Sequence, residues 1–474
     1  MQLNWTVIGG GSVNWMYGIM RDIYRMDEIE GGRIRLVDPN TEHVEAVAAL
    51  LREFNRQRGR NYEISVVADR REALRDANFV VATFSPGAMD AFRRDLEIPI
   101  RYGIRLPVSM TVGPGGISSA MRAIPVAHEI VQDMEQVCPG AWLLNETNPM
   151  TTVTRAMNMA ARTVRVVGLC HGLHHHLAVV LGPTLGLARP EGMTTPRYIY
   201  EWLPQQGFEF SIGGVNHFIF LVKARLKGED VLPRIRRYCA EHVAEQMEAN
   251  CFQQFNSPKV RIPNHAAAMA ICRQVGYLPI NHDRHVMEFL PGVCNAQNGF
   301  GIKYGTNKTT VDERLLTKAR QLERIRKAAR GEEKVSWPET NDWWDLMGEG
   351  FIPLVRALLG GPAVTTVVNL PNRGQLANLP ADAVVETLGR VTARGIDPDP
   401  VGDLPRPLAA WCRLHVEVQE LTVRAALEGS REFMIEALTL DPLCGIADLS
   451  AIPAMADELL EANRQWLPRF YPKG

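Results

Sequence analysis

The chain has 474 residues, about three times the ~150 residues of a typical domain, which excludes a small disulfide-stapled scaffold and predicts two packed lobes or one long α/β chain. Its 52 lysine and arginine residues balance 53 aspartate and glutamate residues, which excludes a strong global field for nucleic acid or anionic lipid. Apolar residues make up 46 % and charged residues 22 %, as in ordinary globular proteins. We therefore expect a small-molecule partner, with no nucleic acid and no membrane.

The cysteines and the hydropathy predict the compartment. The eight cysteines are scattered and form no C-x-x-C pair, which is typical of reduced thiols in a reducing compartment. No apolar run approaches the ~20 residues of a membrane span, and we recognise no signal peptide before the first predicted strand. We expect a cytoplasmic protein.

The first part of the chain alternates short β-branched runs with longer helical patterns. This rhythm predicts a Rossmann-type, doubly wound parallel sheet in an α/β domain over residues 1–195. Helical patterns long enough for right-handed crossovers cover residues 41–58 and 118–136. Six strands are predicted, over residues 3–8, 33–37, 62–67, 79–84, 141–144 and 164–169.

The second part of the chain has a different rhythm. Residues 208–226 are typical of strands, whereas residues 231–249, 311–329 and 408–427 are typical of helices. Turn-forming residues mark loops, but no low-complexity linker separates two independent bodies. We expect a mixed α/β, helix-rich second lobe over residues 196–474 that holds substrate and metal and forms oligomer contacts.

A glycine-rich segment follows the first predicted strand. Backbone N–H groups of Gly9, Gly11, Ser12 and Val13 can meet a pyrophosphate there, and Asp38 at the end of the second strand can accept bonds from a ribose diol. These features favour NAD over NADP, although Asn14 replaces the third glycine of the fingerprint and a strand–turn–helix without ligand is the alternative. Two further strand ends add cofactor candidates, which are Ser85 and Asn145.

Cysteine and histidine residues follow the sixth strand. Cys170 is followed by His171 and, after two more residues, by three consecutive histidines, and His217 stands alone in an otherwise apolar predicted strand. Cys170 and His217 suit a divalent transition metal with positions left open for substrate hydroxyls. The alternative is that both side chains are ordinary core residues.

Titratable groups gather again at residues 279–291. Asp283 is a candidate general base if burial raises its pKa, and a helix N-cap is the alternative. The Gly113–Gly116 turn can cradle a ligand or start a helix, and the sequence favours the helix start.

The ordered set of motifs resembles family 4 of the glycoside hydrolases, the NAD- and Mn²⁺-dependent glycosidases. The resemblance covers roughly residues 6–443 and rests on motifs beginning at Ile8, Gly113, Asn145, Cys170, Gly214, Asp283, Asn369, Asn378, Val385 and Asp441. It implies NAD and Mn²⁺ (or another divalent metal) as cofactors. It also implies C3 oxidation of the sugar, C2 deprotonation, elimination, water addition and return of the hydride, with no net redox change.

Residue by residue, the resemblance implies that Cys170 and His217 hold the metal and that Asn148 orients sugar hydroxyls. His171 falls where the family places the acid for the leaving oxygen, and Asp283 falls at or beside the family's base. A uronic acid needs a cation at C6, for which the candidates are Arg284, Arg105 and Lys303.

The substrate class follows from departures from the family pattern. His171 and Met110 both differ from the residues of 6-phospho-glycosidases, and His282 replaces a glycine at the pocket lip. We expect cleavage of α-linked uronosides, as in α-glucuronidases or α-galacturonidases, by a homodimer or homotetramer. The alternatives are an α-glucosidase or α-galactosidase of the same family, an NAD-dependent hydroxy-acid or sugar dehydrogenase, and a metabolite-sensing binding protein.

Overall fold

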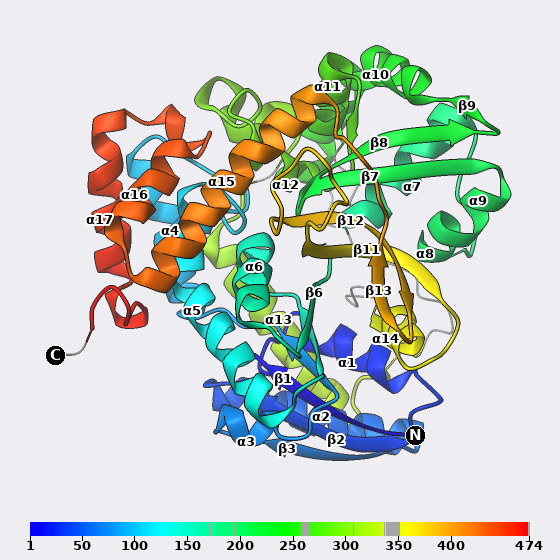
Figure 1. Ribbon diagram of the computed structural model, residues 1–474, viewed down its shortest axis with the longest axis vertical. Coiled ribbons are helices and arrows are strands. Elements are labelled where there is room, and N and C mark those ends of the chain that lie inside the picture. The colour runs from blue at the N-terminus through cyan, green and yellow to red at the C-terminus, as the bar shows by residue number, and fades with distance from the viewer. Residues whose placement is uncertain are drawn as a thin grey trace.

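The parallel half of the sheet is built as the sequence predicts. The computed structural model describes residues 1–170, 172–193, 195–256, 265–306, 308–335, 337 and 351–472. Six parallel strands lie in the order β6-β5-β4-β1-β2-β3, with the first strand at the centre as in a doubly wound dinucleotide fold (Figure 1). They are β1 (Gln2–Ile8), β2 (Gly31–Val37), β3 (Asn61–Val66), β4 (Phe79–Ala82), β5 (Trp142–Asn145) and β6 (Arg165–Gly168).

Seven further strands extend this sheet. Within the described residues, thirteen strands form one sheet, because β11 runs antiparallel to β6 and joins β12, which pairs with β7. The added strands are β7 (Phe208–Val215), β8 (Phe218–Leu226), β9 (Glu229–Asp230), β10 (Leu278–Pro279), β11 (Val364–Pro371), β12 (Val384–Thr392) and β13 (Gly395–Pro398). The sheet therefore crosses the predicted boundary at residue 195, which stays a prediction.

Helices cover both faces of the parallel half. The crossover helices are α1 (Met16–Tyr24), α2 (Thr41–Arg58), α3 (Arg70–Leu74), α4 (Ala88–Arg101), α5 (Gly113–Val137) and α6 (Met150–Ala160). The middle of the chain adds α7 (Gly172–Leu185), α8 (Thr195–Arg197), the π-helical turn η1 (Tyr198–Trp202), α9 (Leu203–Gln205), α10 (Leu232–Asn256), α11 (Ala266–Val275), α12 (Asp283–Val286), η2 (Met287–Phe289) and η3 (Ala296–Tyr304). The remainder are α13 (Val311–Ala329), α14 (Phe351–Leu358), α15 (Arg406–Glu428), α16 (Arg431–Leu440), η4 (Cys444–Ile446), η5 (Leu449–Ala451), α17 (Ile452–Ala462) and η6 (Arg464–Trp466).

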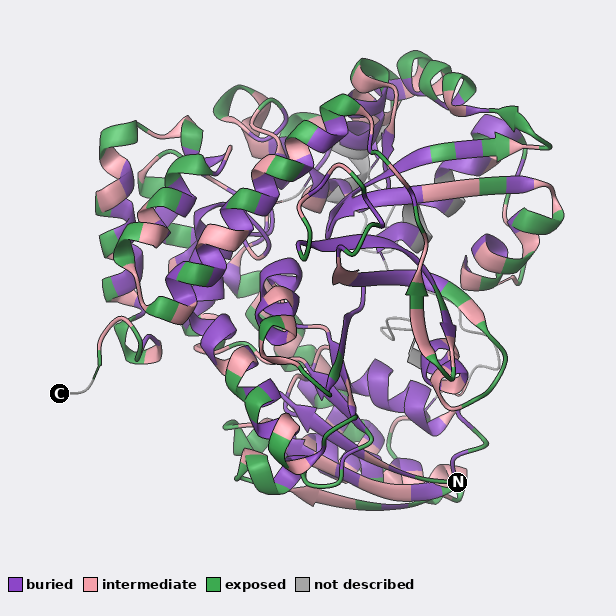
Figure 2. Ribbon diagram, viewed as in Figure 1, coloured by how far each residue is buried: buried purple, intermediate pink, exposed green. Residues whose placement is uncertain are grey.

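The core joins segments that are distant in sequence. One apolar cluster packs α5 and α6 against α15–α17, and a second packs α1 and α2 against α13 and α14. A third lies between β7, β8 and helices α7, α10 and α11. Figure 2 shows mostly buried strands, while the helices at the periphery alternate buried and exposed residues. This alternation is the amphipathic pattern that predicted helices 311–329 and 408–427.

Three local expectations are corrected. The helix predicted from residue 118 begins at Gly113, because Pro114 occupies its first turn, where its missing N–H costs nothing. His217 lies in the turn between β7 and β8, and not within a strand. The helix after the glycine loop begins only at Met16, one turn beyond the loop.

The described residues also show the state of the cysteines and the character of the helices. The described cysteine side chains are buried and form no disulfide with one another. No helix among the described residues combines the length and the apolar character needed to cross a membrane.

Candidate active site

Many of the predicted site residues lie next to one row of cross-strand residue pairs that runs across the sheet. Each of the first five residues in this row is the last residue of its parallel strand, so the loops that follow all leave from one edge. From β2 to β7 the row is Val37, Ile8, Ala82, Asn145, Gly168, Asn369, Glu386 and Gly214. The glycine loop and Cys170 therefore leave from this edge, and the turn that carries His217 follows Val215, the residue after the last member of the same row.

The glycine loop is pressed against its neighbours. Gly9 has φ +89°, and a Cβ there would lie 2.1 Å from the Thr83 carbonyl oxygen, so only glycine fits. Gly11 N donates to Asp38 Oδ2 at 2.9 Å, which fixes the carboxylate beside the loop. Asn14 Oδ1 is buried and accepts no hydrogen bond from a described residue. The glycine loop therefore contains a buried side-chain oxygen, Asn14 Oδ1, that has no hydrogen-bond partner among the described residues.

Three predicted residues near the ends of β4 and β5 differ in burial and in hydrogen bonding. Asn145 is fully buried, donates from Nδ2 to Thr154 Oγ1 at 2.9 Å and accepts from Thr147 N at 2.9 Å, so it shapes the loop. Asn148 is half-buried, and its Oδ1 has no partner among the described residues. Ser85 is exposed beyond β4. Of these three, Asn148 is the one with a buried side-chain oxygen that lacks a partner among the described residues.

His217 is held in a fixed orientation. Its backbone is left-handed, with φ +68°, and its Nδ1 lies 2.9 Å from Thr111 Oγ1. Its ring stacks on the His285 ring with centroids 4.0 Å apart. Burial and the charges of neighbouring residues hold the pKa of His285 well below its usual value, so this ring is neutral at pH 7.

Cys170 lies between two glycines that bring asparagines close to it. A Cβ on Gly168 would lie 3.0 Å from Asn369 Cβ, and a Cβ on Gly172 would lie 2.3 Å from Asn281 Nδ2. The same segment that carries Asn281 also carries His285, which stacks on the His217 ring. The segment 281–289 therefore connects the surroundings of Cys170 and His217. The predicted acid His171 lies outside the described residues.

Buried amide and carboxylate side chains stand on the two strands next to β6, near the segment of Cys170 and the turn of His217. Asn369 is fully buried, and its side-chain amide has no partner among the described residues. Its cross-strand neighbour Glu386 accepts from Asn216 Nδ2 at 2.6 Å, next to His217. Buried amides without protein partners are costly, so a polar ligand at this place is favoured.

Asp283 is engaged with a helix end. Its Oδ2 accepts from Ala267 N at 2.6 Å and its Oδ1 from Ala268 N at 3.0 Å, in the first turn of α11. Burial raises its pKa to about 8. Both oxygens are turned towards the helix, and this geometry favours the capping interpretation over the general-base interpretation.

Cations adjoin the histidine pair. Arg284 Nη2 donates to Thr309 Oγ1 at 2.5 Å. Arg314 on α13 faces the charges of Arg284 and Glu288, and Lys318, one turn further along α13, faces Arg314 and Asp38. Burial and the repulsion from Arg284 lower the pKa of Arg314 to about 10. A line of positive charge thus runs from the histidine pair to the glycine loop.

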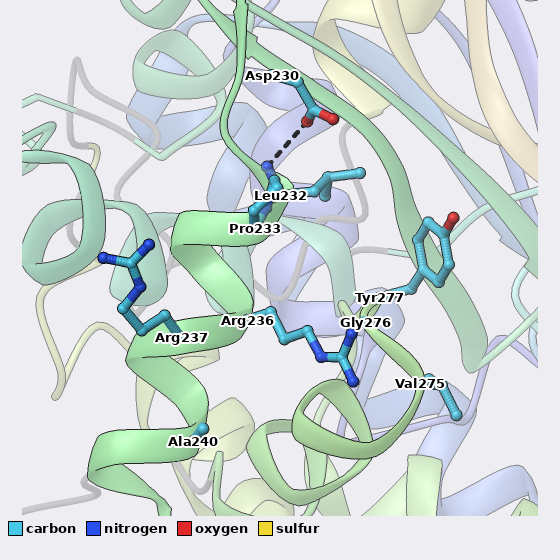
Figure 3. A pocket seen from close by; sticks show the side chains of 9 residues that line it. All are labelled: Asp230, Leu232, Pro233, Arg236, Arg237, Ala240, Val275, Gly276 and Tyr277. Atoms are coloured by element: carbon cyan, nitrogen blue, oxygen red, sulfur yellow. Dashed lines mark hydrogen bonds between the residues drawn. The ribbon is translucent and has the colours of Figure 1, made fainter.

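A surface pocket lies apart from the predicted site residues. It has a volume of about 460 Å³ and lies between the start of α10 and the end of α11 (Figure 3). Arg236 in this pocket donates to the carbonyl oxygens of Arg273 and Gln274, which end α11. None of the predicted site residues lines it. The strand-edge cluster, where the candidate ligands and polar groups gather, is therefore the candidate active site.

Several residues of this cluster were not singled out from the sequence. Thr111 and Arg314 carry no recognisable signal, because each reaches the site through a fold contact that has no fixed spacing. Asn369 and Glu386 lie inside motifs that carried the family resemblance, and Asn281 lies in the predicted cluster at residues 279–291, so these segments were a usable signal. Within the described residues, no group of three or more His, Cys, Asp or Glu side chains is arranged to hold a metal.

The relatives of the chain share its full length. It is 29 % identical over 471 residues to an alpha-galacturonidase of Bacillus subtilis, with 98 % of each chain covered. It is 28 % identical over 472 residues to an alpha-galactosidase of the same organism, with 98 % of this chain and 99 % of the relative covered.

Solved structures have the same fold. The crystal structure of lplD from Bacillus subtilis has a TM-score of 0.82 at 26 % identity, covering 97 % of this chain and 100 % of the other. A 6-phospho-alpha-glucosidase from gut microorganisms, solved in complex with NAD and Mn²⁺, has a TM-score of 0.78 at 20 % identity, with 99 % of each chain covered.

The family models match both halves of the chain. The model described as "Family 4 glycosyl hydrolase" matches residues 4–181, and that described as "Family 4 glycosyl hydrolase C-terminal domain" matches residues 212–444. The ordered motifs, the doubly wound sheet and these matches agree, and the chain belongs to family 4 of the glycosyl hydrolases.

Proposed function

We propose that this family 4 hydrolase cleaves α-linked uronides, with α-galacturonides as its substrates. The observation that carries the proposal is that the glycine loop, Cys170 and the turn of His217 all follow strands that share a single row of paired residues. Four relatives named alpha-galacturonidase, 26–29 % identical over nearly the whole chain, support the choice of sugar.

The residues at this edge fit a divalent metal held by Cys170 and His217. Thr111 Oγ1 lies within hydrogen-bond distance of His217 Nδ1 and fixes the ring. In this proposal Nε2 of the imidazole binds the metal, because metal-bound histidines usually engage their other ring nitrogen in such a hydrogen bond. Thiolate and imidazole suit Mn²⁺ less than carboxylates do, so open positions for sugar oxygens are part of the proposal. When bound, the ion supplies Lewis-acid stabilisation of negative charge on the sugar oxygens.

The residues at the other end of the row fit NAD. Asp38 is held beside the glycine loop by the Gly11 amide, where its carboxylate can accept from a ribose diol and repels a 2′-phosphate. The orphaned Asn14 Oδ1 lies in the same loop. When bound, the dinucleotide supplies reversible hydride acceptance from the sugar.

Side chains between these two sites are assigned to the sugar. The amides of Asn148 and Asn369 have polar atoms without partners among the described residues, and Asn281 Nδ2 is in the same situation beside Gly172. In this proposal they donate to and accept from sugar hydroxyls, which fixes the ring against the cofactor. His171 is proposed as the proton donor to the leaving oxygen, following the family resemblance.

Activity measurements test the function directly. We expect release of nitrophenol from a nitrophenyl α-galacturonide to require NAD⁺, Mn²⁺ and a reductant that keeps Cys170 reduced. NADH absorbance is expected not to accumulate, because the hydride returns in each turnover. Steady accumulation of NADH indicates a dehydrogenase instead. Parallel assays with α-glucuronide and α-galactoside identify the sugar, and preference for the neutral α-galactoside contradicts the proposal.

A further inference from the structure

A partly buried arginine on α13, Arg314, forms no salt bridge with a described carboxylate, although Glu288 is close enough to act on its charge. Arg314 forms no ion pair with any described residue, and its guanidinium lies over the Phe92 ring, 4.7 Å from the ring centroid. Phe92 packs with Leu96 and Val311, so the aromatic face beneath the guanidinium is fixed. An immobilised arginine that lacks a carboxylate is well prepared to bind one from a ligand.

We propose that Arg314, together with Arg284, binds the C6 carboxylate of the uronide. This inference rests on the proposed function and adds to it the residue that distinguishes uronides from neutral sugars.

The charge balance of the cluster supports an anionic ligand. The guanidinium groups of Arg284 and Arg314 share one nearby carboxylate, that of Glu288. Glu288 Oε1 accepts from Val108 N at 2.5 Å and Ser109 N at 2.8 Å, whereas its buried Oε2 has no hydrogen-bond partner among the described residues, so neither arginine is hydrogen-bonded to this carboxylate. Burial also raises the pKa of Glu288 to about 7, so its negative charge is incomplete at neutral pH. Arg314 therefore retains positive charge that no described carboxylate pairs with.

The position of Arg314 agrees with the geometry of a pyranose. Carbons C2 and C3 carry the hydroxyls assigned to the metal, and C6 lies on the opposite side of the ring. His285, which stacks on His217, directly follows Arg284 in the chain, and Arg284 Nη2 donates to Thr309 Oγ1, two residues before the start of α13, the helix that carries Arg314. A sugar with its C2–C3 edge at His217 thus extends its carboxylate towards the two arginines.

Other cations fit this role less well. Lys303 is exposed, and the Lys308 ammonium lies 5.5 Å from the centroid of the Phe300 ring. Lys318 faces Asp38 at the cofactor end of α13. Arg314 is therefore the cation on α13 that faces the sugar.

Substitution of Arg314 tests the inference. For Arg314→Leu we expect the ratio of kcat/KM for nitrophenyl α-galacturonide to kcat/KM for nitrophenyl α-galactoside to fall at least roughly 30-fold, chiefly through KM. Arg314→Lys keeps the charge and is expected to recover part of the ratio. Arg320→Leu is the matched control, because Arg320 is exposed on the same helix. An equal loss on both substrates for Arg314→Leu overturns the inference.

A binding measurement separates this inference from the proposed function. Calorimetric titration of the NAD- and Mn²⁺-loaded enzyme with D-galacturonate and with D-galactose needs no turnover. Arg314→Leu is expected to weaken galacturonate binding and to remove the preference over galactose, with thermal unfolding checking that the variant folds. If the wild type cleaves no uronide but binds galacturonate through Arg314, the proposed carboxylate site is supported and the proposed activity is wrong. If the wild type cleaves uronides and Arg314→Leu equals Arg320→Leu, the inference fails and the function stands. Absence of both cleavage and binding overturns both.

Discussion

At the scale of single residues, the orientation of His217 depends on Thr111. The hydroxyl is buried, 7 % exposed, and lies 2.9 Å from His217 Nδ1. Thr111→Val keeps the shape and removes the hydrogen bond, so we expect Mn²⁺ affinity to fall about 10- to 100-fold, as for other outer-shell partners. Titration followed by the spin-resonance signal of free Mn²⁺ measures this. Thr111→Ser retains the hydroxyl and should bind as the wild type does; unchanged affinity in Thr111→Val contradicts the prediction.

Cys170 gives a second prediction at this scale. A serine hydroxyl stays protonated where a thiol can be a thiolate ligand, so Cys170→Ser should lower Mn²⁺ affinity by more than the ~100-fold upper range of an outer-shell change. Cys138 is the matched control, since it is also buried but precedes β5 at the opposite edge of the sheet. Equal Mn²⁺ affinities for Cys170→Ser and Cys138→Ser exclude Cys170 from the metal site.

At the scale of elements, periodicity predicted much of what the structure shows. Helices over 41–58 and 311–329 have the predicted bounds, because each begins at a capping side chain, Asn40 or Thr310, and carries an amphipathic pattern. The six parallel strands were predicted within two residues at each end. The turn at His217 was missed because both flanking strands are apolar and lack a glycine-based turn pair between them.

The site was predictable only where residues stand at strand ends. Cys170 and the glycine loop follow strands, so strand order alone places them at one edge. Arg314 reaches the site from the start of α13, and α13 packs on α2 and α4 through tertiary contacts that no local pattern encodes. His171 lies outside the described residues and stays a prediction.

The contact between Asp283 and α11 gives a prediction about an element. The carboxylate accepts two backbone N–H groups at the helix start, and an amide in its place can accept at one of these positions only. Asp283→Asn should therefore lower the free energy of unfolding by about 2 kcal/mol, measured by urea denaturation. Unchanged stability combined with abolished turnover restores the general-base interpretation.

Burial of the Asp283 carboxyl group makes stability depend on pH. Burial raises the pKa of Asp283 to about 8, whereas an unfolded aspartate has a pKa of about 3.9. Between these values the folded chain keeps a proton that the unfolded chain has released, so the contribution of Asp283 to stability falls as pH rises from about 4 to about 8. The stability difference between the wild type and Asp283→Asn should narrow over this range. If the free energies of unfolding of the two proteins change with pH in parallel, this prediction is wrong.

At the scale of the whole molecule, the two predicted lobes share their cores. Both large apolar clusters contain side chains from each side of residue 195. Polar contacts cross as well, since Gly113 N donates to Asp441 Oδ2 at 3.0 Å and Arg155 pairs with Glu420 at 2.8 Å. Separating the two halves would expose the apolar clusters that they share. We therefore expect one cooperative unfolding transition. The predicted homodimer or homotetramer stays a prediction, which light scattering after size exclusion measures.

Cofactor binding tests this cooperativity. A ligand at 100 times its Kd stabilises the native state by about 2.7 kcal/mol, and in one cooperative unit the gain reaches every part of the chain. Tryptophans report on both halves, with Trp142 on β5 and Trp411 on α15. NAD should shift the fluorescence and circular-dichroism transitions together, although its loop lies in the first half. NADP is the matched ligand, because the Asp38 carboxylate repels its 2′-phosphate, and should shift both transitions less. A shift confined to one of two separate transitions shows that the continuous sheet does not couple the two halves.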